Sequence, residues 1–206
     1  MLPLMVEYAI YFVTLTIVGL FFIGWVVYGP LKRFLMKHHT VRMYYRKVNR
    51  VVLDNDFYLI NNFENKTGDE VFHIDHIVIG DKFIYCIRDR YFDGALVINE
   101  DNDGWLYYHG KKKHIVSNPL SMNLLRLERL SLMSGIDRKL FVSIVVINDD
   151  CLITPFTSTR DNSFLVSLKG LPKLIKYIES RNVEILDPHL SAVAARDFSE
   201  LNLHGK

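Results

Sequence analysis

The sequence predicts an α/β domain, a mixed β-sheet flanked by helices, preceded by a single N-terminal transmembrane helix. Three observations lead to this fold class. An uncharged apolar run opens the chain, strand-like segments alternate with amphipathic helical segments after it, and some of the strands are apolar on both faces. With 206 residues the chain has room for one ordinary domain and an appendage.

The N-terminal segment is long and apolar enough to cross a bilayer. Residues 8–28, YAIYFVTLTIVGLFFIGWVVY, run for 21 positions without a charge, and about 20 such residues span the hydrocarbon core as a helix. Aromatic residues lie near both ends, where their rings favour the interface. A cleaved signal peptide needs a basic start, a shorter apolar region and a small-residue cleavage site, which GPLKRF does not provide. We therefore expect residues 1–30 to be a transmembrane anchor.

Charge predicts the orientation of this anchor. Seven Lys or Arg residues and no acid lie in the basic juxtamembrane segment 31–50, and no Lys or Arg precedes the span. The positive-inside rule then gives a single-pass protein of the cell membrane with a cytoplasmic C-terminal domain. The two unpaired cysteines, Cys86 and Cys151, agree with a reducing compartment. The basic segment can touch anionic lipid or act only as a topology signal.

The segments that follow predict one domain over residues 51–206. A short helix at 41–55 leads into it, and strands are expected at 57–63, 71–79, 82–88, 94–99, 104–110, 139–148 and 163–168. Asn118 and Pro119 are typical of a helix start. Leucines then recur at helical spacing, and Arg126, Glu128 and Arg129 are expected to face water. Two more helices are expected at 171–181 and 189–202.

Charged residues gather where two of these strands end. Asp75 precedes the apolar run IVI, and Arg88 and Arg90 follow FIYCI. If Gly80–Asp81 is a two-residue hairpin turn, Asp75 faces Cys86 and becomes a diagonal neighbour of Arg88. Asp75, Arg88 and Arg90 then share one face of the sheet, because side chains alternate along a strand.

The order of motifs in this region resembles the nuclease-related domain family, NERD, a branch of the PD-(D/E)xK nucleases. The family pattern is an Asp-His-apolar strand, a turn, a strand ending in Ile-Glu-x-Lys, then a Gly, a Trp, and Asn-Pro before a helix. This chain offers, in the same order, IDHIVIG, FIYCIRDR, Gly94, Trp105 and NPLSMN. The resemblance implies a restriction-endonuclease-like fold, in which two acids hold Mg²⁺ and a Lys helps to activate the attacking water.

This chain departs from the family pattern at the catalytic positions. Asp75 matches the first metal ligand, but Arg88 stands in place of the Glu and Arg90 in place of the Lys. A guanidinium offers no oxygen and keeps its charge, so Arg88 would replace the metal by an ion pair with Asp75. The Gln expected after Asn-Pro corresponds to Met122, and the Gly-Glu of the family's leading helix has no counterpart. The sequence therefore predicts lost cleavage and no cofactor, with Mg²⁺ required only if catalysis is retained.

Several interpretations stay open at this stage. The domain can bind DNA or RNA through the two arginines and a basic loop, HGKKKH, that carries Lys111, Lys112 and Lys113. A loop of this kind is more often a solvated hairpin tip, and the arginines can be a salt-bridged strand end without a ligand. The domain can instead hold a protein partner. It can also still cut, with an acid supplied by Glu70 or Glu100; Asp89 is less suitable because it points to the opposite face.

Overall fold

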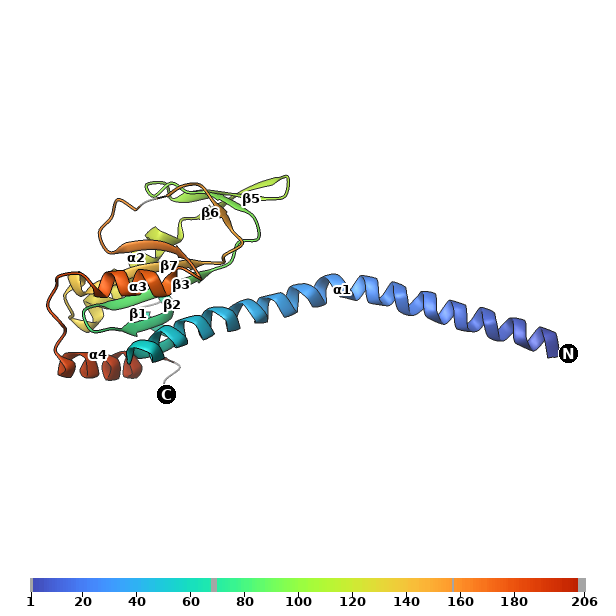
Figure 1. The fold of residues 1–206 in the computed structure, drawn as a ribbon, viewed down its shortest axis with the longest axis horizontal. Helices are drawn as coiled ribbons and strands as arrows, with labels where there is room; N and C mark the ends of the chain where they lie inside the picture. Colours follow the sequence, from blue (N-terminus) through green and yellow to red (C-terminus); the bar gives the residue numbers. More distant parts are fainter. Residues whose placement is uncertain (1, 68–69, 157, 204–206) are drawn as a thin grey trace. The chain divides into compact units, whose positions relative to one another are not determined.

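The computed structural model describes residues 2–67, 70–156 and 158–203. The chain divides into two compact units, residues 1–43 and 44–206. The first unit is the greater part of a long helix, α1 (Leu2–Asn55), whose last turns belong to the second unit. The second unit contains the described strands and the other helices, and it has the mixed α/β fold that the sequence predicts (Figure 1).

The predicted membrane span lies within α1. The helix has a mean hydropathy of 2.0 over Tyr11–Tyr28 and buries none of this stretch within the protein. The hydroxyl of Thr16 donates to the carbonyl of Phe12 at 2.8 Å, so this polar group is satisfied inside the helix. The segment is therefore long and apolar enough to cross a membrane. The side chains of residues 29–40, which include three bases of the predicted basic segment, lie outside the described ones.

The predicted short helix at 41–55 is the continuation of α1. No Gly or Pro occurs between residues 31 and 55, so this stretch contains no helix-breaking residue. Its last turns contribute Tyr44, Val48, Val51 and Val52 to the core of the second unit. The hydroxyl of Tyr44 donates to the carbonyl of Arg90 at 2.7 Å and so ties this end of the helix to the sheet.

A five-stranded sheet in the order β1-β2-β3-β7-β9 forms the centre of the second unit. The first three strands run antiparallel to one another: β1 (Tyr58–Thr67), β2 (Glu70–Ile79) and β3 (Ile84–Arg90). The other two join β3 in parallel: β7 (Phe141–Ile147) and β9 (Ser163–Ser167). Every residue of β7 is buried, as expected for a strand that is covered on both faces.

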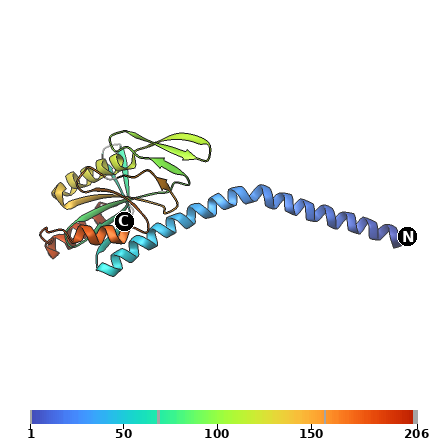
Figure 2. The same ribbon diagram turned by 45° about the horizontal axis from the view of Figure 1, so that its top comes forward.

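Helices cover both faces of this sheet. Two helices, α2 (Pro119–Ser134) and α4 (Pro188–Leu201), share a core with the face that carries Ile77, Ile84 and Cys86. A third helix, α3 (Leu171–Glu179), meets the opposite face, where the hydroxyl of Tyr85 donates to Oε1 of Glu179 at 2.5 Å. Figure 2 shows α2 (yellow) and α3 (orange) on opposite sides of the sheet.

A second, smaller sheet has the strand order β6-β5-β4-β8. Its strands are β4 (Ala95–Val97), β5 (Gly104–His109), β6 (Lys112–Ser117) and β8 (Leu152–Ile153), and a short 3₁₀ helix, η1 (Arg138–Leu140), precedes β7. Trp105 and Leu96 pack with Leu120 of α2 and with Val145 and Ile147 of β7. Gly94 allows β4 to approach β5, since a Cβ there would collide with the carbonyl oxygen of Tyr108.

The β2–β3 hairpin differs from the predicted one in its register. Ile79 pairs with Ile84 and Ile77 with Cys86, so residues 80–83 form a four-residue connection instead of a two-residue turn. The cause is Phe83, which is buried and whose carbonyl accepts a hydrogen bond from the N–H of Gly80 at 2.9 Å. Residues that share a face in the predicted register also share one in this register. The pairing ends at His76 and Ile87, and its continuation by one pair would place Asp75 opposite Arg88.

Candidate functional site

The predicted pair of Asp75 and Arg88 is present at the end of the hairpin. Nη1 of Arg88 lies 3.1 Å from Oδ1 of Asp75, and their side chains are 13% and 21% exposed. Nε2 of His73 lies 3.0 Å from the same oxygen, and the backbone N–H of Asp89 donates to the other oxygen at 2.9 Å. Burial alone would raise the pKa of Asp75, but the hydrogen bond with His73 and the charge of Arg88 lower it below its ordinary value.

Arg90 follows on the same face of β3. Its Nη1 has one long contact, 3.4 Å to the carbonyl of Asp89. Burial, and then the like charge of Arg88, lower the pKa of Arg90. Arg88 itself uses Nη1 for Asp75 and for a long contact to the carbonyl of His73, while its Nε is buried without a hydrogen-bond partner. The two arginines therefore keep donors that the surrounding side chains do not satisfy.

Helix α2 brings a third arginine to this face. Arg126 is half-buried, and its Nη1 is buried without a partner. Burial and the charges of Arg88 and Arg90 lower the pKa of Arg126 to about 10. The prediction that Arg126 faces water is wrong, because it lies one turn after the buried Asn123 and next to the buried Leu127. Helical spacing from Asn123 is the sequence signal that could have revealed this residue.

Asn123 is the polar residue that α2 directs into the sheet. It is fully buried, and its Nδ2 donates to the carbonyl of Cys86 at 2.9 Å and to the hydroxyl of Ser143 at 2.8 Å. Met122, which occupies the position of the expected Gln, is 41% exposed. Asn118 caps the helix as predicted, since its side chain accepts from the backbone N–H groups of Leu120 and Ser121.

Asp89 points to the opposite face of the sheet, as its parity predicts. Its Oδ2 lies 2.9 Å from Nε2 of the buried His76, whose Nδ1 lies 2.6 Å from Oδ1 of Asn61. Burial raises the pKa of Asp89, although His76 opposes this effect. Asp75 and Asp89 therefore direct their carboxylates to different faces of the sheet and do not converge on one cation.

The two other acids considered for a migrated site are Glu70 and Glu100. Glu100 is buried and accepts hydrogen bonds from the hydroxyl of Ser158 at 2.6 Å and the backbone N–H of Thr159 at 2.9 Å, so a loop holds it. The side chain of Glu70 lies outside the described ones. The described residues form no group of three or more His, Cys, Asp or Glu that could hold a metal ion. The Asp75 site does not fit Mg²⁺, because its neighbour is a guanidinium and donors contact both carboxylate oxygens.

The lysines of the predicted basic loop lie in a β-hairpin of the smaller sheet. Lys112 and Lys113 belong to β6, which pairs with β5, so the turn is confined to Gly110 and Lys111. Gly110 has a φ of +58°, which favours glycine at this turn. Residues 109–114 therefore form the exposed tip of a hairpin, which is one of the two interpretations left open by the sequence. All three lysines are exposed, and their hairpin belongs to a different sheet from β3, which carries Arg88 and Arg90.

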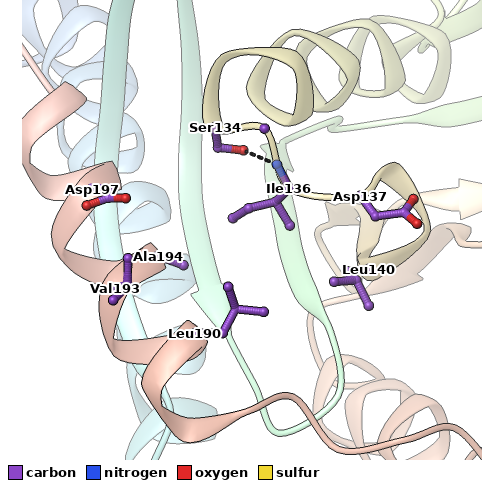
Figure 3. Close-up of a pocket in the computed structure, with 9 residues that line it drawn as sticks. Ser134, Ile136, Asp137, Leu140, Leu190, Val193, Ala194 and Asp197 are labelled. Atoms are coloured by element: carbon purple, nitrogen blue, oxygen red, sulfur yellow. Dashed lines mark hydrogen bonds between the residues drawn. The ribbon is translucent and has the colours of Figure 1, made fainter.

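A separate hollow of about 320 Å³ lies at the C-terminal end of α2, against α4 (Figure 3). Its lining is largely apolar and includes Ile136, Leu140 and Leu190. The two carboxylates at its edge have local partners: Asp137 accepts from the N–H of Lys139, and Asp197 pairs with Arg196. Both carboxylates are therefore engaged within the protein, and the three arginines are the better candidate site.

A comparison with known families finds a match over the part of the chain that forms this site. The model of the nuclease-related domain family matches residues 40–148, more than half of the chain. This range includes the β2–β3 hairpin with Asp75, Arg88 and Arg90, and the part of α2 with Arg126. No curated protein and no solved structure matches the chain significantly.

Proposed function

The chain belongs to the nuclease-related domain family, and from this premise we propose that it is a membrane-anchored, nuclease-like protein that binds DNA or RNA without cutting it. The observation that carries the proposal is the 3.1 Å ion pair between Arg88 and Asp75. It stands where the family pattern has a carboxylate pair for a metal ion. The proposed site residues are Asp75, Arg88 and Arg90.

Loss of cleavage follows from the chemistry of these residues. Arg88 supplies no oxygen ligand and keeps a positive charge next to Asp75, so a divalent cation is repelled from the position. Arg90 retains the charge of the expected Lys but does not exchange a proton at physiological pH. Without a metal ion or a proton-transferring group, the attacking water has no activation at this site.

Binding of nucleic acid is supported by the same charges. Guanidinium groups form charge-assisted, often bidentate hydrogen bonds with phosphate oxygens. The exposed lysines on the β5–β6 hairpin, Lys111, Lys112 and Lys113, add a positive surface that attracts a phosphate backbone. We expect the affinity to fall steeply with salt concentration, because phosphate contacts release bound counterions.

Anchoring at the cell membrane is proposed from α1. The stretch Tyr11–Tyr28 is apolar enough to span the bilayer. The seven Lys and Arg residues between positions 31 and 50 support a cytoplasmic nuclease-related domain, by the positive-inside rule. Such a protein would hold nucleic acid at the inner surface of the membrane.

The direct test is a cleavage assay on the detergent-solubilised protein with single- and double-stranded DNA and RNA, in Mg²⁺ or Mn²⁺. We expect no cleavage by the wild type, and activity in an Arg88→Glu/Arg90→Lys double variant that restores the family pattern. Asp75→Ala added to that variant should abolish the activity. Metal-dependent cleavage by the wild type that is lost in Asp75→Ala would contradict the proposal and indicate a migrated acid.

A protein-binding scaffold is the second candidate. Helix α2 exposes an apolar stripe at helical spacing, with Met122, Leu125 and Leu132 at 41%, 54% and 83% exposure. This candidate predicts no affinity for nucleic acid at any salt concentration, which separates it from the first.

A further inference from the structure

We propose that Arg88, Arg90 and Arg126 form one binding site for a phosphate monoester, the terminal phosphate of a nucleic-acid strand. The inference rests on the proposed function, because it names the part of the nucleic acid that the site holds. It adds Arg126, which the family pattern does not include among its catalytic positions.

The first support is the arrangement of the chain. Arg88 and Arg90 lie at alternate positions of β3, on the face that α2 covers. Asn123 fixes α2 over β3 through its hydrogen bond to the carbonyl of Cys86, two residues before Arg88. Arg126 follows Asn123 by one helical turn and therefore lies on the side of α2 that faces the strand.

The second support is the set of unsatisfied donors. Nε of Arg88 and Nη1 of Arg126 are both buried and have no hydrogen-bond partner. Nη1 of Arg90 has one contact, at 3.4 Å, which is too long for a strong hydrogen bond. Buried donors without partners are costly and rare in folded proteins. An anion with several oxygens would satisfy donors from all three side chains at once.

The third support is the balance of charge. Asp75 is the acid that forms an ion pair with this cluster, and the carboxylate of Asp89 is engaged by His76 on the other face. Among the described residues, the three guanidinium groups and the one carboxylate paired with them carry an excess of two positive charges. A phosphate monoester carries a charge of about −1.5 to −2 at pH 7 and matches this excess. An internal phosphodiester carries a single charge, so it would leave part of the excess unbalanced.

The fourth support is burial. The side chain of Arg88 is 13% exposed, and Arg90 and Arg126 are half-buried. A terminal phosphate has one ester bond and can approach such partly buried donors with three free oxygens. An internal phosphate is flanked by sugars on both sides, which keep its oxygens further from partly buried donors.

The test measures the affinity of the full-length protein, in a nonionic detergent, for internally labelled single-stranded oligonucleotides of one sequence. The strands carry a 5′-phosphate, a 3′-phosphate or hydroxyl groups at both ends, and fluorescence anisotropy reports binding. We expect one of the phosphorylated strands to bind about tenfold more tightly than the hydroxyl strand, because charge-assisted hydrogen bonds are gained. Arg126→Gln should remove this preference, and Arg126→Lys, which keeps the charge but not the planar fork, should retain part of it.

The matched control is Lys173→Gln, which removes one exposed positive charge from α3, on the opposite face of the sheet, and should leave the preference unchanged. Melting temperatures of all variants show that they are folded. Equal affinity for the three strands would overturn the terminal-phosphate site and leave nucleic-acid binding intact. No binding of any strand at low salt would overturn both. Loss of the preference when inorganic phosphate competes at micromolar concentration would show that free phosphate, not a strand end, is the ligand.

Discussion

Arg88 reverses the charge at a position where the nuclease-related pattern has a metal ligand. The carboxylate of Asp75 therefore contacts Arg88, His73 and the backbone N–H of Asp89. The pKa values of Arg90 and Arg126 are lowered by burial and by the neighbouring guanidinium of Arg88. The side chain at position 88 thus brings a positive charge next to Asp75 where the family pattern has a carboxylate.

Replacing Asp75 with Asn should destabilise the domain in a pH-dependent way. The pKa of Asp75 is lowered in the folded protein, so its contribution is present above the unfolded value of about 3.9 and is lost as the pH falls through the folded value. We expect Asp75→Asn to lower the free energy of unfolding by about 1–3 kcal/mol at pH 7. The difference from the wild type should shrink below about pH 4.

Urea unfolding between pH 3 and pH 7 measures this difference, and Asp101→Asn, at an exposed position, is the control. A difference between Asp75→Asn and the wild type that stays constant down to pH 3 would mean that the ion pair with Arg88 does not stabilise the fold.

Arg88→Glu should create a cation site that the wild type does not have. The new carboxylate faces Asp75 across the hairpin, and two such acids repel each other until a divalent ion neutralises them. We expect about 10 mM Mg²⁺ to raise the melting temperature of this variant by about 2–4 °C and that of the wild type by less. Arg88→Gln, which removes the charge without adding a carboxylate, should not respond. Equal stabilisation of the wild type by Mg²⁺ would show that Asp75 binds metal despite Arg88.

The β2–β3 hairpin and helix α2 together position the site. Apolar alternation along the two strands was sufficient to predict which residues share a face, because the side-chain period of a strand is two. It was not sufficient to predict the register, which depends on whether Phe83 turns inward, a matter of tertiary packing. The burial of Arg126 could not be predicted for a similar reason. A charged residue beside a stripe of leucines is normally solvated unless another element covers it.

Other elements also differ in whether the local sequence alone predicts them. Leucine spacing and the Asn118–Pro119 start were sufficient to predict α2. The sequence did not predict β6, because it opens with lysines and five of its six residues are exposed, so no buried face marks it as a strand. Its partner β5 supplies the ladder, and pairing of this kind is not visible in a local window of sequence.

Asn118 fixes the start of α2. Its Oδ1 accepts from Leu120 and Ser121, and its Nδ2 donates to the carbonyls of Glu100 and Asn102. Asn118→Ala should lower the free energy of unfolding by about 1–3 kcal/mol, measured in urea. Asn118→Ser keeps a capping oxygen and should cost less. Equal losses in the two variants would indicate that the cap itself contributes little.

At the scale of the whole molecule, α1 joins an apolar span to the domain with the site. We expect the full-length protein to sediment with membranes and to resist extraction by high salt and by alkaline carbonate, while a nonionic detergent releases it, because the apolar stretch Tyr11–Tyr28 is exposed along its length. Replacing Leu20 and Ile23 with Arg places charges in the middle of this stretch and should release the protein from the membrane. Extraction of the wild type by salt alone would contradict a spanning helix and favour peripheral attachment.

The most direct test of nucleic-acid binding by the arginines is the salt dependence of the affinity. Binding of a labelled single strand to the full-length protein in detergent is measured over a series of salt concentrations, for the wild type and for Arg88→Gln/Arg90→Gln. Each phosphate contact contributes a slope of about −0.7 in a plot of log K against log salt, so the slope of the double variant, which loses at least one contact, should be less steep by at least about 0.7. A slope equal to that of the wild type, or no binding by the wild type even at low salt, would contradict the claim that these arginines hold nucleic acid.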